Sequence, residues 1–170
     1  RVTGESPEIA KVIFEKMGIK QVDGVLTEWG SLIPGLRAGR FDVIAAGMYI
    51  TPARCKQVIF TDPQYALPDT LLVAQGNPKN LHSYADIARN PDVKLAIMAG
   101  TVNLAYARDS GITDAQILQV PDTTAQLQAV RAGRADAAVG TQLTMKGLAK
   151  KGGDKVEAIS DFTDDPAHTG

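Results

Sequence analysis

The chain of 170 residues contains one cysteine, two histidines and nine aromatic residues. The single cysteine, Cys55, excludes a disulfide within the chain and cannot build a metal cluster by itself. His82 and His168 have no partner at the spacing of metal ligands, so both are interpreted as surface or loop residues. We therefore expect neither a bound metal nor a cofactor.

Long apolar runs and an excess of charge of one sign are absent as well. The longest run of apolar residues and glycine covers residues 43–50, far short of the roughly 20 residues that a membrane-spanning helix needs. The formal net charge is −1, which argues against nucleic acid as a partner because such binding demands a basic surface. What is present is an ordinary globular composition, with 44% hydrophobic and 22% charged residues.

A near-identical phrase occurs twice, as Leu-Arg-Ala-Gly-Arg-Phe-Asp at residues 36–42 and as Val-Arg-Ala-Gly-Arg-Ala-Asp at residues 130–136. In each copy a helical pattern precedes Gly39 or Gly133, where a helix C-terminus favours a positive φ, and an apolar segment follows. The copies are too far apart for a solenoid, whose units run about 20–50 residues. The phrase thus indicates two lobes built from the same unit, with coincidence as the alternative.

Apolar periodicity and turn residues predict an alternation of helices and strands. Helices are expected at residues 6–18 (with Ser6 as N-cap), 30–38, directly after Thr51-Pro52, and at 83–89, 103–109, 123–132 and 142–150. Strands are expected at residues 22–26, 41–46, 58–60, 70–74, 95–99, 117–120, 135–139 and 156–159. Such alternation predicts an α/β fold of largely parallel sheets with helices on both faces. The lobe boundary is placed near residues 75–77.

Residues 47–54, Gly-Met-Tyr-Ile-Thr-Pro-Ala-Arg, carry the clearest candidate for binding chemistry. Thr51 caps and Pro52 starts a short helix, which places Arg54 in a first turn, where a cation is disfavoured by roughly 0.3–1 kcal/mol. A guanidinium can make two parallel hydrogen bonds to a carboxylate, so this position suggests a nearby anion. A salt bridge to a surface acid explains Arg54 equally well.

In the second half of the chain, Gly100 and Thr101 precede another predicted helix. The first N–H groups of that helix and the Thr101 hydroxyl could contact the same anion, although Thr101 could be only a cap or turn residue. No nucleophile elbow, phosphate loop, dinucleotide fingerprint or zinc-binding His/Glu pair is present in the sequence. The acids Asp62, Asp86 and Asp136 are interpreted as caps, turns or solvated charges.

The run from Trp29 to Tyr65, which includes Leu-Arg-Ala-Gly-Arg-Phe-Asp and Ile-Thr-Pro-Ala-Arg, resembles the signature of the amino-acid-type (family 3) solute-binding proteins of ABC importers. Gly100-Thr101 and residues 133–136 match the second-lobe part of that pattern. The resemblance implies a type II periplasmic-binding-protein-like fold, in which two hinged α/β lobes close on one small solute. It further implies a monomer, periplasmic or anchored outside a Gram-positive cell, that delivers the solute to permease subunits.

The resemblance also assigns roles to residues and narrows the ligand. It implies that Arg54 and Thr101 clamp the ligand carboxylate, while backbone around Gly47–Tyr49 holds the cationic end. Many members carry an acid where Thr141 stands, and this acid pairs with an α-ammonium group. Trp29 and Tyr49 could instead face a delocalised cation, at about 0.5–2 kcal/mol each, although core packing is the default for any aromatic residue. The expected ligand-binding set is Trp29, Gly47, Met48, Tyr49, Thr51, Arg54, Gly100, Thr101 and Thr141.

This combination most resembles the ectoine- and hydroxyectoine-binding receptors, with a polar amino acid as the alternative ligand. The family has a strand before the position of Arg1 and a hinge strand after Gly170, so we expect truncation at both ends. The lobes are then residues 1–75 (incomplete) and 76–162, with residues 163–170 starting a return crossover. A dehydratase on the same fold and a ligand-sensing domain are the other function classes. The dehydratase would need a buried carboxylate facing the cleft, for which the sequence offers no obvious candidate.

Overall fold

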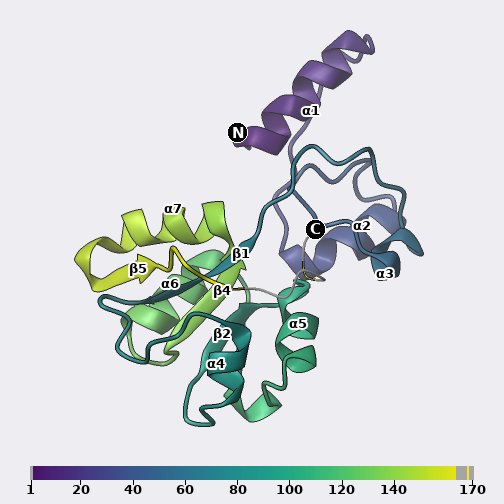
Figure 1. The fold of residues 1–170 in the computed structure, drawn as a ribbon. Coiled ribbons are helices and arrows are strands. Elements are labelled where there is room, and N and C mark those ends of the chain that lie inside the picture. Colours follow the sequence, from purple (N-terminus) through teal and green to yellow (C-terminus); the bar gives the residue numbers. More distant parts are fainter. Residues whose placement is uncertain (1, 164–167, 169–170) are drawn as a thin grey trace. The chain divides into compact units, whose positions relative to one another are not determined.

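The computed structural model describes residues 2–163 and residue 168. The chain forms two compact units, unit 1 (Arg1–Pro63) and unit 2 (Gln64–Gly170), and Figure 1 labels most of their helices and strands. No helix among the described residues has the length and apolar character needed to cross a membrane.

Unit 1 consists of helices and extended segments, and residues 2–63 include no strand. Its elements are α1 (Glu5–Lys16), the 3-10 turn η1 (Trp29–Ser31), α2 (Leu32–Arg37) and α3 (Pro52–Cys55). The strands predicted at residues 22–26, 41–46 and 58–60 are not formed. An extended segment becomes a strand only when a neighbouring backbone pairs with its N–H and C=O groups, and these segments take part in no such ladder.

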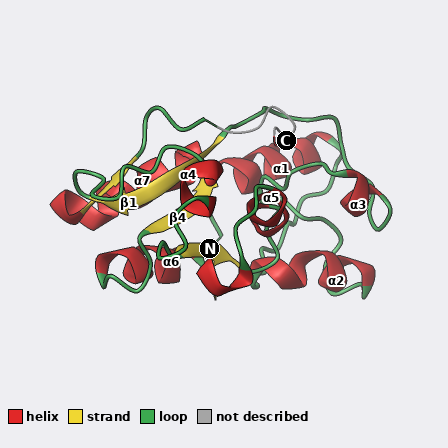
Figure 2. Ribbon diagram, turned by 60° about the horizontal axis from the view of Figure 1, so that its bottom comes forward, coloured by secondary structure: helices red, strands yellow, loops and turns green. Residues whose placement is uncertain are grey.

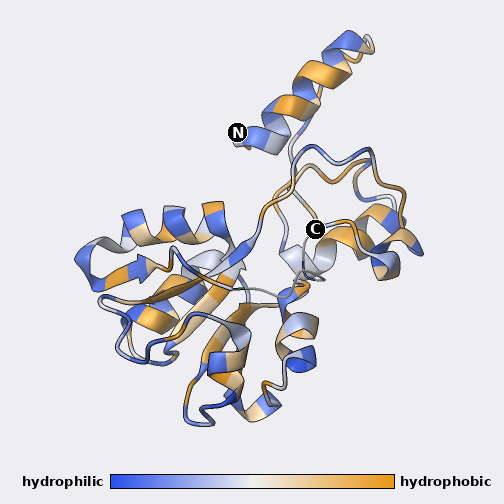
Figure 3. Ribbon diagram, viewed as in Figure 1, coloured by the Kyte–Doolittle hydropathy of each residue, from blue (hydrophilic) through white to orange (hydrophobic). Residues whose placement is uncertain are grey.

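The first helix, α1, has an apolar stripe (Figure 3) but buries none of its residues. Its Val12 and Ile13 and the C-cap residue Met17 are all exposed. The helix starts after Gly4, which acts as N-cap without a side-chain hydrogen bond, and this corrects the prediction that Ser6 is the N-cap. Pro7 lies within the first turn, where its missing N–H has no intrahelical partner to lose.

Unit 2 is built on a five-stranded sheet in the order β3-β2-β4-β1-β5. The strands are β1 (Asp69–Ala74), β2 (Leu95–Met98), β3 (Ile117–Val120), β4 (Ala137–Thr141) and β5 (Val156–Ala158). β2 runs parallel to β3 and β4, whereas β1 runs antiparallel to β4 and β5. The sheet is therefore mixed rather than largely parallel, because β1 crosses it in the opposite direction.

Helices cover both faces of this sheet (Figure 2), as predicted. They are α4 (Tyr84–Ala88), α5 (Asn103–Asp109), α6 (Thr123–Arg131) and α7 (Gln142–Gly152), with 3-10 turns η2 (Asp114–Gln116) and η3 (Gly153–Lys155). The helix and strand bounds of unit 2 agree with the sequence prediction to within two residues. Apolar periodicity was sufficient here because each element buries one regular face.

Alternate residues of β1, β2, β3 and β4 enter two separate cores, as the two-residue period of a strand requires. Leu71 and Val73 of β1 join Ile87 of α4 in one hydrophobic cluster, which also contains Ala107 of α5. Leu72, between them, joins the cluster of α6 and α7 on the opposite face. The sheet is thus buried on both sides.

The turn that follows β1 lies inside unit 2. The Gln75 backbone N–H donates to the Lys155 carbonyl at 3.1 Å, and its side-chain Nε2 donates to Glu157 at 2.9 Å. The two compact units divide between Pro63 and Gln64, one strand earlier than the boundary placed near residues 75–77. The division differs because β1 pairs with β4 and β5. Most of residues 163–170 lie outside the described part of the chain.

Candidate ligand-binding site

In unit 1, residues 49–54 form a closed hook around the start of α3. The Thr51 Oγ1 accepts a hydrogen bond from the Arg54 backbone N–H at 3.3 Å, and Pro52 occupies the first turn. The Arg54 Nη1 donates to the Tyr49 carbonyl at 2.9 Å, and Arg54 as a whole residue is 9% exposed. The predicted cap is confirmed, and the hook brings three of the expected site residues together.

The first-turn position of Arg54 does not by itself indicate a nearby anion. α3 has four residues, so Arg54 lies in its last turn as much as in its first. A single turn aligns too few peptide dipoles to penalise a cation at one particular end. What sets Arg54 apart is its burial, because a buried guanidinium requires hydrogen-bond acceptors around it.

The structure defines the surroundings of Gly47, Met48 and Trp29 less fully than those of Arg54. Gly47 has φ +61, a conformation that glycine adopts without strain, and Met48 is half-buried. Trp29 opens η1, and its indole Nε1 is buried without a hydrogen-bond partner among the described residues. The role of Trp29 in binding a cation stays a prediction.

In unit 2, the loop after β2 carries Gly100 and Thr101. Gly100 has φ +80, and the Thr101 Oγ1 donates to the Met98 carbonyl at 2.8 Å. α5 begins two residues later, after Val102, without a side-chain cap on its first turn. The Thr101 proton is therefore directed at Met98, and it would have to rotate away before the hydroxyl could donate to a carboxylate.

Thr141, the last residue of β4, is the N-cap of α7. Its Oγ1 accepts from the Thr144 backbone N–H at 3.4 Å and lies 2.8 Å from the Thr144 hydroxyl oxygen. The hydroxyl thus has a structural task that the sequence analysis did not assign to it. This task does not exclude contact with a ligand, because a hydroxyl oxygen has two acceptor sites.

Thr101 and Thr141 lie at the same edge of the sheet. Thr101 follows β2, and Thr141 is the last residue of β4. Because these two strands are parallel neighbours, their carboxyl ends lie at the same edge. The chain leaves β2 for β3 on one side and returns through α6 to β4 on the other. This is a topological switch point, the usual ligand position in open α/β sheets.

The same edge holds a buried carboxylate that the sequence analysis missed. Asp69 begins β1, faces Thr141 in the antiparallel register and is 3% exposed. Tyr84 donates its hydroxyl to Asp69 at 3.3 Å, and the Asn103 amide donates to both Asp69 and Tyr84. The sequence signal that could have indicated Asp69 is an acidic residue directly before an apolar strand. Its location depends on the antiparallel direction of β1, which the sequence does not reveal.

The two histidines differ. His82 is half-buried, and its Nδ1 lies 2.8 Å from Asp161. His168 is buried, and its ring stacks on Tyr106 with centroids 3.9 Å apart, which corrects its assignment to the surface. Across the described residues, no group of three or more histidine, cysteine or acidic side chains could hold a metal ion.

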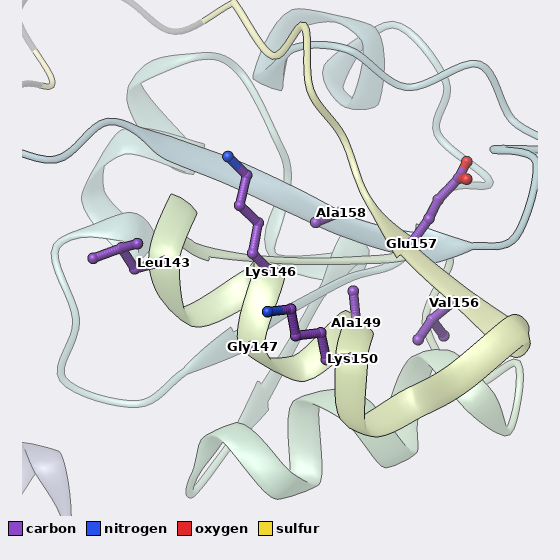
Figure 4. Close-up of a pocket in the computed structure, with 8 residues that line it drawn as sticks. All are labelled: Leu143, Lys146, Gly147, Ala149, Lys150, Val156, Glu157 and Ala158. Carbon is purple, nitrogen blue, oxygen red and sulfur yellow. The ribbon is translucent and has the colours of Figure 1, made fainter. Parts of the chain in front are cut away.

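An open pocket of about 530 Å³ lies between α7 and β5 (Figure 4). Lys146, Lys150 and Glu157 supply its charged groups, and aliphatic side chains such as Leu143 line the rest. None of the expected ligand-binding residues lines it. The pocket therefore lies apart from the expected ligand-binding residues of unit 2, Gly100, Thr101 and Thr141.

A mixed sheet covered on both faces, with polar side chains at its switch point, defines an α/β binding unit. The chain belongs to the bacterial extracellular solute-binding proteins, family 3, whose family model matches residues 1–162. This confirms the resemblance seen in the sequence, and the fold is that of the type II periplasmic-binding proteins.

Individual relatives support this assignment. A probable amino-acid ABC transporter periplasmic-binding protein of Sinorhizobium fredii is 42% identical over 165 residues, which cover 96% of this chain and 54% of that protein. The crystal structure of EhuB in complex with hydroxyectoine matches with a TM-score of 0.89 at 34% identity, covering 94% of this chain and 63% of that one.

An ancestral amino acid-binding protein, AncCDT-1, described as a precursor of cyclohexadienyl dehydratase, matches with a TM-score of 0.84 at 35% identity and covers 96% of this chain and 69% of that one. The present chain spans about half the length of the Sinorhizobium relative. The family is described by extracellular solute binding, the Sinorhizobium relative by binding for an amino-acid ABC transporter, and the ancestral protein by amino-acid binding.

Proposed function

We propose that the protein captures a small zwitterionic solute outside the cytoplasm and delivers it to the permease subunits of an ABC importer. Family membership and the transporter-associated relatives support this role. It requires binding and release without a chemical step, so we propose a receptor rather than an enzyme. We also propose that it acts as a periplasmic or cell-surface monomer.

The observation that carries the proposal is the buried Arg54 in its hook. A guanidinium has five N–H donors in one plane, and the bond from Nη1 to the Tyr49 carbonyl orients that plane. An oriented guanidinium loses little freedom when a carboxylate binds its fork. Arg54 is therefore suited to anchor the carboxylate end of a ligand.

The switch-point edge of unit 2 supplies the second half of the proposed site. Thr101 and the backbone N–H groups at the start of α5 are donors of the kind that a carboxylate accepts. A ligand held by both units is satisfied at both ends only when they close on it. It would then shift the population toward the closed state by its higher affinity for that state.

An ectoine-like ligand, with a carboxylate and a delocalised ring cation, is our first candidate. Thr141 carries no charge and already caps α7, so it cannot neutralise the ammonium group of an amino acid, and burying such a charge unpaired is costly. The match to EhuB, whose structure contains hydroxyectoine, points the same way.

A polar amino acid is the second candidate, and Asp69 is the observation that favours it. Its carboxylate lies opposite Thr141 in the strand register, where side chains are typically about 4.5–5.5 Å apart at Cβ. Asp69 could therefore supply the negative charge that position 141 lacks. The Sinorhizobium relative is named for amino-acid transport.

Titration calorimetry with ectoine, hydroxyectoine, glycine betaine, arginine and glutamine tests the ligand class. Tighter binding of arginine or glutamine than of ectoine would exclude the first candidate and leave the second. Thr141→Asp is expected to favour the amino acids, because it restores an acid at the edge of the site. Trp29→Ala should weaken ectoine selectively if the indole faces the cation.

Arg54→Ala tests the anchor itself. We expect at least tenfold weaker binding of every carboxylate ligand, since hydrogen bonds to charged groups contribute about 1.5–3 kcal/mol. Arg54→Lys should recover part of the loss, because an ammonium cannot reproduce the planar fork. Arg37→Ala is the matched control, since Arg37 is exposed at the end of α2. Binding by Arg54→Ala within threefold of the parent would contradict the assignment.

A further inference from the structure

Unit 2 contains two fully buried glutamines, Gln116 and Gln126, each 1% exposed. The Gln126 side chain extends from α6 to the sheet, where its Nε2 donates to the Ala96 carbonyl of β2 at 3.2 Å and to the Val139 carbonyl of β4 at 2.8 Å. One amide nitrogen therefore joins two neighbouring strands. Buried carbonyls need a donor, and here a side chain supplies one to each strand.

The ladder between these strands is short. β2 and β4 pair only at Leu95–Ala137 and Ala96–Ala138. Beyond this point β2 stays paired with β3 as far as Met98, and β4 stays paired with β1 as far as Thr141. The two strands thus form a fork, each side held by its outer neighbour, and Gln126 donates to a carbonyl on each side.

The fork opens toward the carboxyl ends of both strands. One side leads into the loop of Gly100 and Thr101, and the other ends at Thr141. We propose that Gln126 is a positioning residue, whose side chain sets the separation of β2 and β4 and thereby that of these two ligand-facing segments. The inference rests on the proposed function in so far as both segments are taken to meet the ligand.

The amide suits this task for a chemical reason. Two carbonyl groups cannot bond to each other, so strands that part expose acceptors that only an inserted donor can satisfy. A side chain of equal length without donors would remove one hydrogen bond from each of these two carbonyls. The strands would then move to find partners, and the segments that continue them would move too.

Gln116 provides a matched control within the same unit. Its Nε2 donates to the carbonyls of Ile87, Asn90 and Val93 at 2.8, 3.0 and 3.4 Å. It is buried to the same extent as Gln126 and bonds the same kind of acceptor. It directly precedes β3, however, so it serves the amino ends of the strands and not the fork.

The test compares Gln126→Met with Gln116→Met in the 170-residue chain. Urea unfolding should show that both substitutions destabilise unit 2. In ¹H–¹⁵N NMR spectra we expect the amide signals of Gly100, Thr101 and Thr141 to shift in Gln126→Met and to stay in place in Gln116→Met. Calorimetry should show at least a fivefold change in the ratio of ectoine to arginine affinity, again only in Gln126→Met.

Equal changes in the two variants, or unchanged fork signals in Gln126→Met, would overturn the inference, since the amide would then serve stability alone. Gln126→Asn keeps both donors on a shorter side chain and should give smaller shifts at the same three residues, which covers the case that the methionine variant fails to fold. If the parent chain binds no ligand of the panel, the proposed function fails, and the NMR signals alone decide the positioning role.

Discussion

The Arg-Ala-Gly-Arg phrase occurs once in each unit, and its two copies share the same helix end. α2 ends at Arg37 and α6 at Arg131, and the glycines that follow, Gly39 and Gly133, both have φ +67. The hydrogen bonds agree too: the N–H of the next arginine bonds the carbonyl five residues earlier, at 3.0 Å in unit 1 and 2.9 Å in unit 2. These bonds form the glycine-ended helix terminus in both places.

The copies diverge directly after the phrase. In unit 2 the chain enters β4, which lies between β2 and β1 and buries Ala137 and Ala138 completely. In unit 1 the corresponding residues 41–46 form no strand, and Val43 is 48% exposed. The helix end needs only its own residues, whereas the strand needs neighbours on each side.

The same contrast holds for whole units. Every hydrophobic side chain that is buried among the described residues lies in unit 2. In unit 1 the described residues classed as buried are Gly35 and Arg54, while Leu26 and Ile59 are 83% and 99% exposed. Because burial of apolar surface is the main source of stability, we expect unit 2 to account for nearly all of the cooperative unfolding of this chain.

Hydrogen exchange should show the largest difference between the units. Amides of β1, β2 and β4 are expected to exchange on the order of 100-fold or more slowly than those of residues 22–26 and 41–46, because exchange from a buried ladder requires cooperative opening. Mass spectrometry of peptide fragments after timed exchange measures this. Comparable protection in the two sets would show that unit 1 has a core of its own.

The second largest difference between the units is expected in the loss of unfolding free energy when a side chain is shortened. Leu95→Ala takes a fully buried side chain out of β2, and we expect a loss of about 2–5 kcal/mol in the free energy of unfolding. Ile59→Ala, at an exposed position of unit 1, should change it by less than about 0.5 kcal/mol. Urea denaturation followed by circular dichroism gives both values, and similar losses would contradict the comparison.

The paired glycines allow a finer test. Gly39 and Gly133 have the same φ and open space where a Cβ would stand, so alanine adds only backbone strain, roughly 1–2 kcal/mol. Gly133→Ala is expected to lower the unfolding free energy of unit 2 by this amount. Gly39→Ala should leave the main urea transition in place. Equal shifts would mean that the two units unfold together.

The smallest expected effect concerns pH. Burial raises the pKa of Asp86, but hydrogen bonds from the His82 backbone and Ser83 and the charge of Arg89 outweigh it, leaving the pKa below its ordinary value of 3.8. The ionised group therefore stabilises unit 2 above this value, and the contribution disappears as the pH falls through the lowered pKa. Asp86→Asn should flatten the acid limb of stability against pH. Asp92→Asn, at an exposed site, should leave that limb unchanged.

Much of unit 2 was predictable because its elements follow local rules. Ser83 and Asp122 cap α4 and α6 through their side chains, and regular apolar spacing located the strands. Local rules also predicted the Thr51 cap and identified Thr101 and Thr141, which lie at the carboxyl ends of β2 and β4. Their roles in binding stay predictions, because a role depends on what approaches these residues.

Other features depended on contacts between residues distant in the chain. The burial of Asp69 follows from the antiparallel direction of β1, and the division between the units follows from the membership of β1 in the unit 2 sheet. The fork at Gln126 arises because β2 and β4 have different outer neighbours. None of these relations leaves a periodic signal in the sequence.

The sequence by itself determined where the helices of unit 2 begin and end, which residues of unit 2 form strands and which family the chain resembles, because caps, glycine conformations and apolar periods act over a few residues. Only the tertiary structure decided the strand order, the mixed direction of the sheet and the absence of strands among residues 2–63. Backbone pairing and burial are satisfied between segments far apart in the chain, so their outcome depends on which segments meet.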